Sequence, residues 1–238
     1  MIEAYLFDVF GTCVDWRAGV ARAAGRAFAA RGVEADAFAF ADAWRALYQP
    51  AMERVRSGGR GYVDLDALHR ENLDAALERF GIEAAFDGPA REALNRAWER
   101  LPPWADTVPG LVALRRRAIV APCSNGSVAM MTRLARWAGL PWDCVLGAGV
   151  ARAYKPRPEV YLASCAALRL DPSRVMMVAA HNGDLAAARA AGLSTGFFPR
   201  PIEHGPGQTT DLAPAQDWDL VAEDLVDLAE RALGEGAP

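Results

Sequence analysis

The chain has 238 residues, with 26 Lys and Arg against 30 Asp and Glu, and 52% of its residues are hydrophobic. This composition is typical of a globular protein and excludes the disordered, collagen-like and fibrous classes. The formal net charge of −4 provides no basic face, so no nucleic-acid partner is expected. The first residues, MIEAYLFDVFG, contain no basic leader and no apolar run reaches about 18 residues, so we expect no membrane contact and a cytoplasmic location. The four cysteines are scattered and form no CxxC pair, which favours reduced thiols.

The chain opens with a short apolar run at residues 4–9 and then changes character. Residues 16–31, 37–55, 63–80 and 88–100 are rich in Ala, Arg, Glu, Leu and aromatic residues, which indicates helices, and glycines mark the breaks between most of them. The Pro102-Pro103 pair cannot continue a helix and is expected to be the return linker. We therefore predict an all-helical cap domain over residues 15–100, inserted after the first strand.

The rest of the chain alternates short apolar runs with amphipathic stretches. The runs at 118–123, 143–146, 175–180 and 195–198 are bounded by Gly, Pro, Ser, Asn or Asp, as buried parallel strands are. Helical spacing of apolar residues appears at 128–138, 158–169 and 184–191. This alternation predicts an α/β fold with a Rossmann-like parallel sheet, and residues 1–14 and 101–238 are expected to form this core domain. The end of the chain, residues 234–238, is expected to fray.

Polar and ionisable side chains gather around the ends of the predicted strands. They are Asp8, Ser124, Asn125, Lys155, His181 and Asp184. In open α/β sheets ligands bind beyond the carboxyl ends of the strands, which places Asp8 at a candidate site. Each of these side chains also has a structural interpretation: turn or helix capping for the Asp, Ser and Asn side chains, a solvated surface charge for the lysine, and a packed core residue for the histidine.

Taken together, these motifs resemble the haloacid dehalogenase-like superfamily, and most closely its (S)-2-haloacid dehalogenases. The opening motif of those enzymes, Asp-x-Tyr/Phe-Gly-Thr, matches residues 8–12, and residues 124–126 match their Ser-Asn-Gly triplet. The Tyr154-Lys155-Pro156 motif with Tyr161 also fits, as does Trp44-Arg45 in the cap. The resemblance covers nearly the whole chain.

The resemblance implies a metal-independent hydrolysis of short 2-haloalkanoic acids to 2-hydroxy acids. Asp8 would attack the carbon that carries the halogen and form an aspartyl ester, which water then hydrolyses. Lys155 is expected to keep Asp8 ionised and oriented. Asp184, with His181 beside it, is expected to position or activate the water.

The resemblance also assigns roles to the remaining site residues. Thr12 and Ser124 would stabilise the oxyanion that forms on Asp8. Arg45 of the cap would bind the substrate and the departing halide, and Asn125 would donate to the halide. An apolar wall around the halogenated carbon, or equally cap–core packing, is expected of Phe10, Trp44, Tyr48 and Tyr161. A homodimer is implied, the small-molecule partners are a 2-haloacid and halide, and neither a cofactor nor a metal is expected.

Two features argue against a Mg²⁺-dependent phosphatase of the same superfamily. Such phosphatases carry a second Asp where this chain has Phe10, and a further carboxylate where Ala179 and Ala180 stand. Mg²⁺ needs several oxygen ligands, whereas a halide leaves as an anion without a metal or an acid. His181 stands where the 2-haloacid dehalogenase pattern has Asn and is a candidate proton shuttle or halide donor. The phosphatase, a hydrolase of a strained cyclic acid and a non-catalytic binding protein remain as alternatives.

Overall fold

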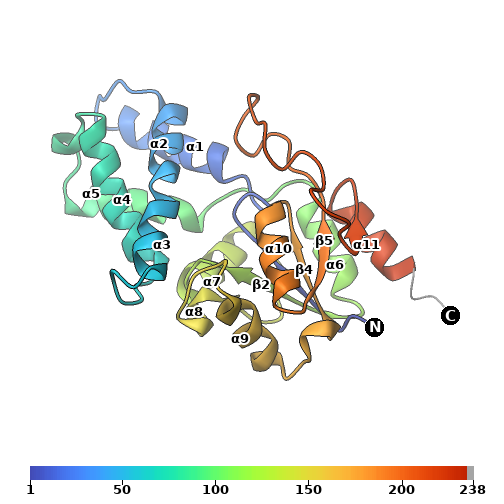
Figure 1. Ribbon diagram of the computed structural model, residues 1–238. Helices are drawn as coiled ribbons and strands as arrows, with labels where there is room; N and C mark the ends of the chain where they lie inside the picture. Colours follow the sequence, from blue (N-terminus) through green and yellow to red (C-terminus); the bar gives the residue numbers. More distant parts are fainter. Residues whose placement is uncertain (235–238) are drawn as a thin grey trace.

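The centre of the structure is a six-stranded sheet in the order β3-β2-β1-β4-β5-β6, and every pairing between neighbouring strands is parallel (Figure 1). The computed structural model describes residues 1–234. The strands are β1 (Ala4–Phe7), β2 (Ile119–Ser124), β3 (Leu146–Gly147), β4 (Val175–Ala179), β5 (Ser194–Phe197) and β6 (Leu220–Val221). The predicted Rossmann-like α/β fold, with its helical insertion after the first strand, is confirmed.

The central strand β1 is buried on both faces of the sheet. Tyr5 and Phe7 belong to the larger apolar cluster, which continues into the cap, whereas Ala4 and Leu6 belong to a second cluster on the opposite face. Parallel sheets are covered by helices on both faces, which explains why this strand is a continuous apolar run rather than an alternating one. The burial fixes the end of β1, and with it the position of the next residue, Asp8.

The helices of the core connect these strands. They are α6 (Thr107–Leu114), α7 (Val128–Ala138), α8 (Ala148–Ala151), α9 (Pro158–Leu168), α10 (Asn182–Ala190) and α11 (Leu225–Gly234), with the 3₁₀ turn η3 (Pro172–Arg174). The predicted helix at 128–138 is confirmed residue for residue, whereas α8, α11 and β6 were not predicted. The strand predicted at 143–146 begins only at its last residue. The predicted frayed end lies outside the described residues beyond Gly234.

The cap consists of helices between β1 and β2, in the upper left of Figure 1. They are α1 (Trp16–Ala29), α2 (Ala37–Ala46), α3 (Tyr48–Arg56), α4 (Leu65–Arg79) and α5 (Gly88–Asn95), with the 3₁₀ turns η1 (Glu83–Ala85) and η2 (Arg96–Glu99). The single helix predicted over residues 37–55 was wrong, because the chain breaks at Leu47 into two helices. Pro50 has no N–H to bond the carbonyl of Ala46, so the helical ladder stops there.

Two linkers join the cap to the core side by side. The Asp15 N–H donates to the Pro102 carbonyl at 2.9 Å, and the Trp104 N–H donates to the Cys13 carbonyl at 3.2 Å. The segment around Pro102 therefore lies beside the segment around Cys13 and Asp15. The exact domain boundaries, at residues 14/15 and 100/101, stay a prediction.

A second set of contacts ties the cap to the loop after α8. Arg56 Nη1 donates to the Lys155 carbonyl at 2.9 Å, and the Tyr154 hydroxyl donates to the Val63 carbonyl at 2.5 Å. Each bond joins a cap residue to a core residue. The loop that carries the Lys155 side chain is thus held against the cap.

All four cysteines are free thiols, in agreement with the sequence analysis. In the described part of the chain, none of the helices combines the length and the apolarity needed to cross a bilayer.

The junction of β2 and β3 generates a stability prediction. Gly147 has φ +97°, and a Cβ there would lie 2.4 Å from the Ser124 carbonyl oxygen. Gly147→Ala should lower the free energy of unfolding by about 3 kcal/mol or more, because backbone strain adds to a backbone overlap. Gly139→Ala is the matched control: its φ is +70° but nothing lies within 4 Å of the added Cβ, so it should cost about 1 kcal/mol. Urea unfolding of both variants measures the difference, and equal losses would contradict the account.

Candidate active site

Asp8 lies directly beyond the carboxyl end of β1, where the chain makes a tight turn. The Cys13 N–H donates to the Val9 carbonyl at 2.9 Å and closes this turn. Gly11, within the turn, has φ +90°, a conformation that residues with a side chain rarely adopt. The turn brings Thr12 back to Asp8, and Thr12 Oγ1 donates to Asp8 Oδ2 at 2.8 Å. The turn formed by the opening sequence motif therefore places the Thr12 hydroxyl within hydrogen-bond distance of the Asp8 carboxylate.

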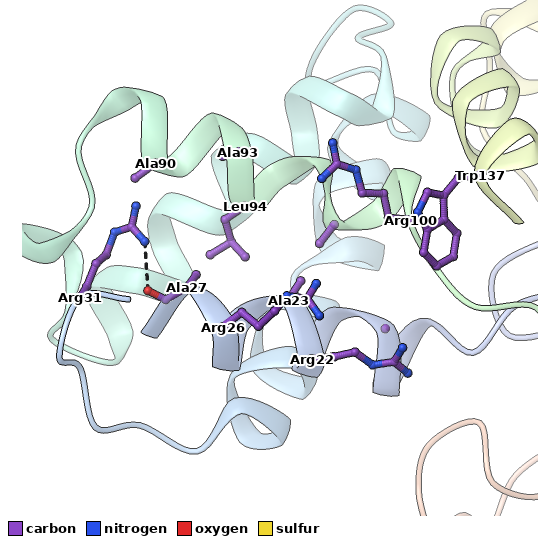
Figure 2. A pocket seen from close by; sticks show the side chains of 12 residues that line it. Arg22, Ala23, Arg26, Ala27, Arg31, Ala90, Ala93, Leu94, Arg100 and Trp137 are labelled. Atoms are coloured by element: carbon purple, nitrogen blue, oxygen red, sulfur yellow. Dashed lines mark hydrogen bonds between the residues drawn. The ribbon is translucent and has the colours of Figure 1, made fainter. Parts of the chain in front are cut away.

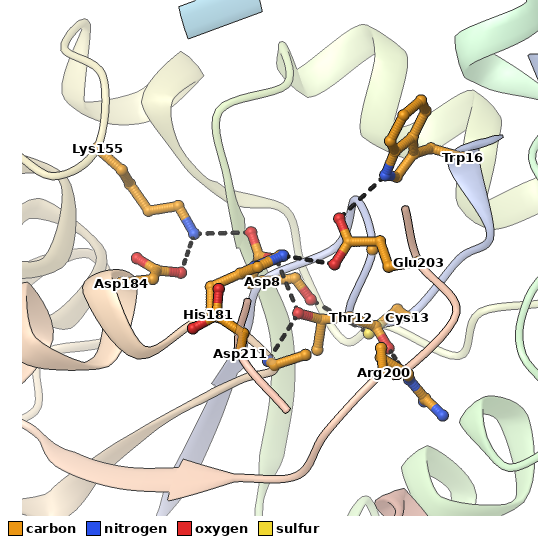
Figure 3. Close-up of polar contacts among 12 residues, drawn as sticks. Asp8, Thr12, Cys13, Trp16, Lys155, His181, Asp184, Arg200, Glu203 and Asp211 are labelled. Carbon is orange, nitrogen blue, oxygen red and sulfur yellow. Dashed lines mark hydrogen bonds and ion pairs between the residues drawn. The ribbon is translucent and has the colours of Figure 1, made fainter. Parts of the chain in front are cut away.

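Lys155 joins two carboxylates (Figure 3). Its Nζ lies 2.9 Å from Asp8 Oδ1 and 2.5 Å from Asp184 Oδ2. The Tyr161 hydroxyl donates to the other oxygen of Asp184, Oδ1, at 2.6 Å. Asp8 and Lys155 come from loops that follow β1 and α8, and Asp184 lies in the first turn of α10 after β4. The ammonium group of Lys155 thus holds two other predicted site residues, Asp8 and Asp184, close together.

His181 bridges Asp8 to a carboxylate that the sequence analysis missed. Its Nδ1 lies 3.0 Å from Asp8 Oδ2, and its Nε2 lies 2.8 Å from Glu203 Oε2. The Trp16 indole N–H, from the cap, donates to Glu203 Oε1 at 3.0 Å. Glu203 is thus a buried anion that contacts both the core histidine and the cap.

Glu203 lies in the loop that follows β5 and is 2% exposed. The signal in the sequence is its place in a loop after a strand, and that signal does not distinguish Glu203 from the other residues of the loop. A Cβ on Gly11 would lie 2.1 Å from Glu203 Oε1. Gly11 therefore serves two purposes, because it allows the positive φ of the turn and leaves space for this carboxylate.

The buried charges shift one another's pKa values. Burial alone would raise the pKa of Asp8, but the charge of Lys155 and the hydrogen bond and charge of His181 outweigh it and hold this pKa well below its ordinary value. Burial would lower the pKa of Lys155, but the charges of Asp184 and Asp8 raise it well above its ordinary value. Asp8 is therefore an anion and Lys155 a cation at neutral pH.

The second cation of the site is His181. Burial would lower its pKa, but the charge of Glu203 and the hydrogen bonds to Asp8 and Glu203 raise it well above 6.5. Burial raises the pKa of Asp184, and the charge of Lys155 offsets this only in part because Asp8 raises it further. Because the raised pKa keeps His181 protonated, its imidazole donates a hydrogen bond to both Asp8 and Glu203.

These residues lie in a cavity of about 1170 Å³ between core and cap. The core contributes Asp8, Asn125, Lys155, His181 and Asp184 among others, and Phe10 and Glu203 also line it. The cap contributes Trp16, Asp42, Arg45, Ala46, Tyr48, Gln49, Glu53 and Arg56. The lining of this cavity thus contains both the ionised carboxylate of Asp8 and the cap arginine Arg45, whose roles in catalysis and substrate binding stay predictions.

Three predicted residues have other surroundings. Trp44 does not line the cavity; it is fully buried, and its indole N–H donates to the His69 carbonyl at 3.0 Å, which supports the packing interpretation. Tyr161 does not line the cavity either and acts on Asp184 instead. The Ser124 hydroxyl accepts from the Gly126 N–H at 3.2 Å, a bond within its own turn. The predicted oxyanion role of Ser124 stays a prediction.

Asn125 orients the lysine loop. Its Oδ1 accepts from the Lys155 backbone N–H at 2.8 Å, and the side chain lines the cavity.

Among residues 1–234, no group of three or more His, Cys, Asp or Glu is arranged to hold a metal ion.

A second cavity, of about 390 Å³, lies along α1 and α5 of the cap (Figure 2). Its lining consists of arginines such as Arg22, Arg26 and Arg100, several alanines, Gly19, Leu94 and Trp137. It contains no carboxylate, imidazole, thiol or hydroxyl, so it offers neither a nucleophile nor a base. The cavity around Asp8 is therefore the candidate active site.

The His181–Glu203 pair generates a titration prediction. In the wild type, His181 should remain protonated at pH 7, and Glu203→Gln should lower its pKa because the largest favourable charge is removed. NMR titration of the imidazole measures this shift. Glu230→Gln, an exposed position, is the control and should leave it unchanged.

The same pair determines a window of stability. The pKa of His181 is raised in the folded state, so its contribution is complete below its unfolded value near 6.5 and is lost as pH rises through its folded pKa. The pKa of Glu203 is lowered, so its contribution is complete above 4.5 and is lost as pH falls through its folded pKa. Glu203→Gln should therefore cost roughly 3–5 kcal/mol, most fully between these two pH values. An unchanged histidine titration or a pH-independent cost would contradict the pairing.

Comparison with known proteins shows the family of this chain. A model of the haloacid dehalogenase-like hydrolase family matches residues 2–192. The (S)-2-haloacid dehalogenase of Xanthobacter autotrophicus is 31% identical over 198 residues, which cover 82% of this chain and 74% of that protein. The crystal structure of a defluorinating L-2-haloacid dehalogenase superposes with a TM-score of 0.95 at 50% identity, covering 97% of this chain and 94% of that one.

A further solved structure, an L-2-haloacid dehalogenase from Xanthobacter autotrophicus with chloropropionic acid covalently bound, has a TM-score of 0.81 at 25% identity and covers 100% of both chains. The fold, the family match and these relatives agree. The chain belongs to the haloacid dehalogenase-like hydrolases, and within that family it is a hydrolase of the group that acts on carbon–halide bonds.

Proposed function

We propose that this protein hydrolyses short 2-haloalkanoic acids to 2-hydroxy acids through an ester on Asp8, without a metal ion. The observation that carries the proposal is the cavity itself. At its base Asp8 is held ionised by Lys155 and His181, and on its cap side lies the Arg45 guanidinium. An anionic substrate with a reactive carbon fits between a nucleophile and a cation.

The two oxygens of Asp8 have different partners, which assigns their roles. Oδ2 accepts hydrogen bonds from Thr12 and His181, whereas Oδ1 contacts Lys155 alone among the described residues. The less engaged Oδ1 would attack the halogenated carbon. A carbon–oxygen bond forms, the carbon–halogen bond breaks, and the halide leaves with the bonding electron pair. The covalent chloropropionic acid adduct of the Xanthobacter relative supports an intermediate of this kind.

Arg45 and Asn125 would bind the substrate. Arg45 Nη1 is buried without a hydrogen-bond partner, and a carboxylate or a departing halide would satisfy it. Asn125 lines the same cavity next to Lys155. An anionic ligand in the cavity would thus accept the hydrogen bond that Arg45 Nη1 lacks in the free enzyme.

Water would then hydrolyse the ester by attack on the Asp8 carbonyl carbon. Charge develops on Oδ2, which already faces the Thr12 hydroxyl and the His181 imidazolium. Asp184 would take the proton of the water: alkylation of Asp8 removes a neighbouring charge that raises the pKa of Asp184, so Asp184 is ionised and able to accept a proton. The acyl–oxygen bond breaks, the leaving alkoxide takes the proton from Asp184, and the 2-hydroxy acid leaves. Asp8 loses its remaining proton to solvent and regains its carboxylate. One water is consumed, and one halide and one proton are released.

The position of Lys155 supports independence from metal. The two carboxylates that would have to share a cation, Asp8 and Asp184, already share the ammonium group. Asp8 therefore has its counter-charge within the chain. The ion pairs of Lys155 thus disfavour the Mg²⁺-dependent phosphatase. The homodimer and the cytoplasmic location stay predictions.

A halide-release assay tests the proposal. The substrates are fluoroacetate, chloroacetate and the two enantiomers of 2-chloropropionate, each with and without EDTA. We expect chelator-resistant release, selective for the (S)-enantiomer, that falls to background in Asp8→Asn. Asp15→Asn is the matched control, because an Asn caps α1 as well as the Asp that accepts from Ala18.

Two outcomes would overturn the proposal. One is halide release that persists in Asp8→Asn. The other is an absence of release together with EDTA-sensitive cleavage of a phosphate ester in the presence of Mg²⁺, which would identify the phosphatase.

A further inference from the structure

Four flat groups of the cap form a continuous stack that ends at the active-site cavity. The rings of Trp98 and His69 are 4.1 Å apart at an interplanar angle of 10°. The rings of His69 and Tyr48 are 5.7 Å apart at 22°. The guanidinium carbon of Arg45 lies 4.0 Å from the centre of the Tyr48 ring. Each member comes from a different helical element: η2, α4, α3 and α2.

Arg45 is held by aromatic rings rather than by an acid. Its guanidinium carbon also lies 5.2 Å from the centre of the Trp16 ring. Within residues 1–234 it makes no ion pair, in contrast to Arg17, which binds both oxygens of Asp42. An aromatic face positions a guanidinium without consuming its N–H groups. All of these donors are then available to an anion in the cavity.

His69 is the buried centre of this stack, and simple packing does not explain it. It is fully buried, and neither of its ring nitrogens has a hydrogen-bond partner. Burial of unpaired polar atoms is unfavourable, so an apolar side chain would suit packing alone better. Burial, and then the charge of Arg45, lower its pKa, so the ring is neutral and adds no repulsion to the cation.

We propose that His69 is a positioning residue for the reaction: its ring fixes Tyr48 against Trp98, and Tyr48 in turn fixes the direction of the Arg45 guanidinium. The role of Arg45 as the cation that binds the substrate rests on the proposed function. The ordering of Arg45 by the stack does not depend on it.

Steady-state kinetics with chloroacetate test the effect on the substrate. His69→Phe keeps an aromatic ring in the stack and should change KM and kcat less than twofold. His69→Leu removes the ring and should raise KM about tenfold with a smaller change in kcat, on the scale of a desolvated cation–π contact. His69→Met is a milder apolar variant that replaces His69→Leu if thermal melting shows the latter to be unfolded.

A double-mutant cycle separates positioning from general destabilisation. In an Arg45→Ala background, His69→Leu should raise KM no further, because the group that it positions is gone. If His69→Leu and His69→Phe behave alike, or if the effect of His69→Leu persists undiminished in Arg45→Ala, His69 does not act through Arg45.

An activity-independent readout distinguishes this inference from the proposed function. In ¹⁵N NMR spectra, the Nε–Hε signal of Arg45, assigned with Arg45→Lys, should be sharp and shifted by ring currents in the wild type and in His69→Phe. It should broaden or move to the free-arginine position in His69→Leu. If this pattern holds but no halide is released, the proposed function fails and the inference stands. If halide is released but the signal is the same in all variants, the inference fails alone.

Discussion

The ion pairs of Lys155 with Asp8 and Asp184 are the interaction on which the rest of the site depends. Burying a charge is costly unless an opposite charge and hydrogen bonds accompany it, and here Asp8 and Lys155 are buried while the Asp184 side chain is 10% exposed. The ends of β1 and β4 and the loop after α8 must therefore converge on one point. The hydrogen bond from Arg56 in the cap to the Lys155 carbonyl holds the cap against the loop that carries Lys155.

A second ion pair, between a part-buried histidine and a buried glutamate, extends this arrangement. His181 and Glu203 add one cation and one anion, and the Trp16 indole connects Glu203 to the cap. An anionic substrate would bring a further negative charge into the cavity. Arg45, whose Nη1 is buried and which has no acidic partner among residues 1–234, is a cap cation available to receive it. The cap thus provides the charge that the core lacks, which explains why cap and core form one site.

The sequence predicted the centre of this site better than its walls. Asp8, His181 and Asp184 follow buried strands, so the geometry of a parallel sheet brings them together without knowledge of side-chain packing. Glu203 lies in a long loop after β5, whose path depends on contacts with Gly11 and Trp16 from distant parts of the chain.

For a related reason, the sequence left open whether Trp44 and Tyr161 line the cavity or pack in the interior. A helical pattern predicts that an aromatic residue is buried, but not whether it faces a cavity or a packed interior. The break at Leu47 required attention to the hydrogen bond that Pro50 cannot make, and β6, with two residues, is too short for periodicity to reveal.

The central claim, that Asp8 forms a covalent ester, is tested most directly by a single turnover of (S)-2-chloropropionate in H₂¹⁸O with enzyme in excess. The account predicts ¹⁸O in the peptide that contains Asp8 and an unlabelled hydroxyl group in the product, whereas ¹⁸O in the product and none in the peptide would show direct attack by water and contradict it.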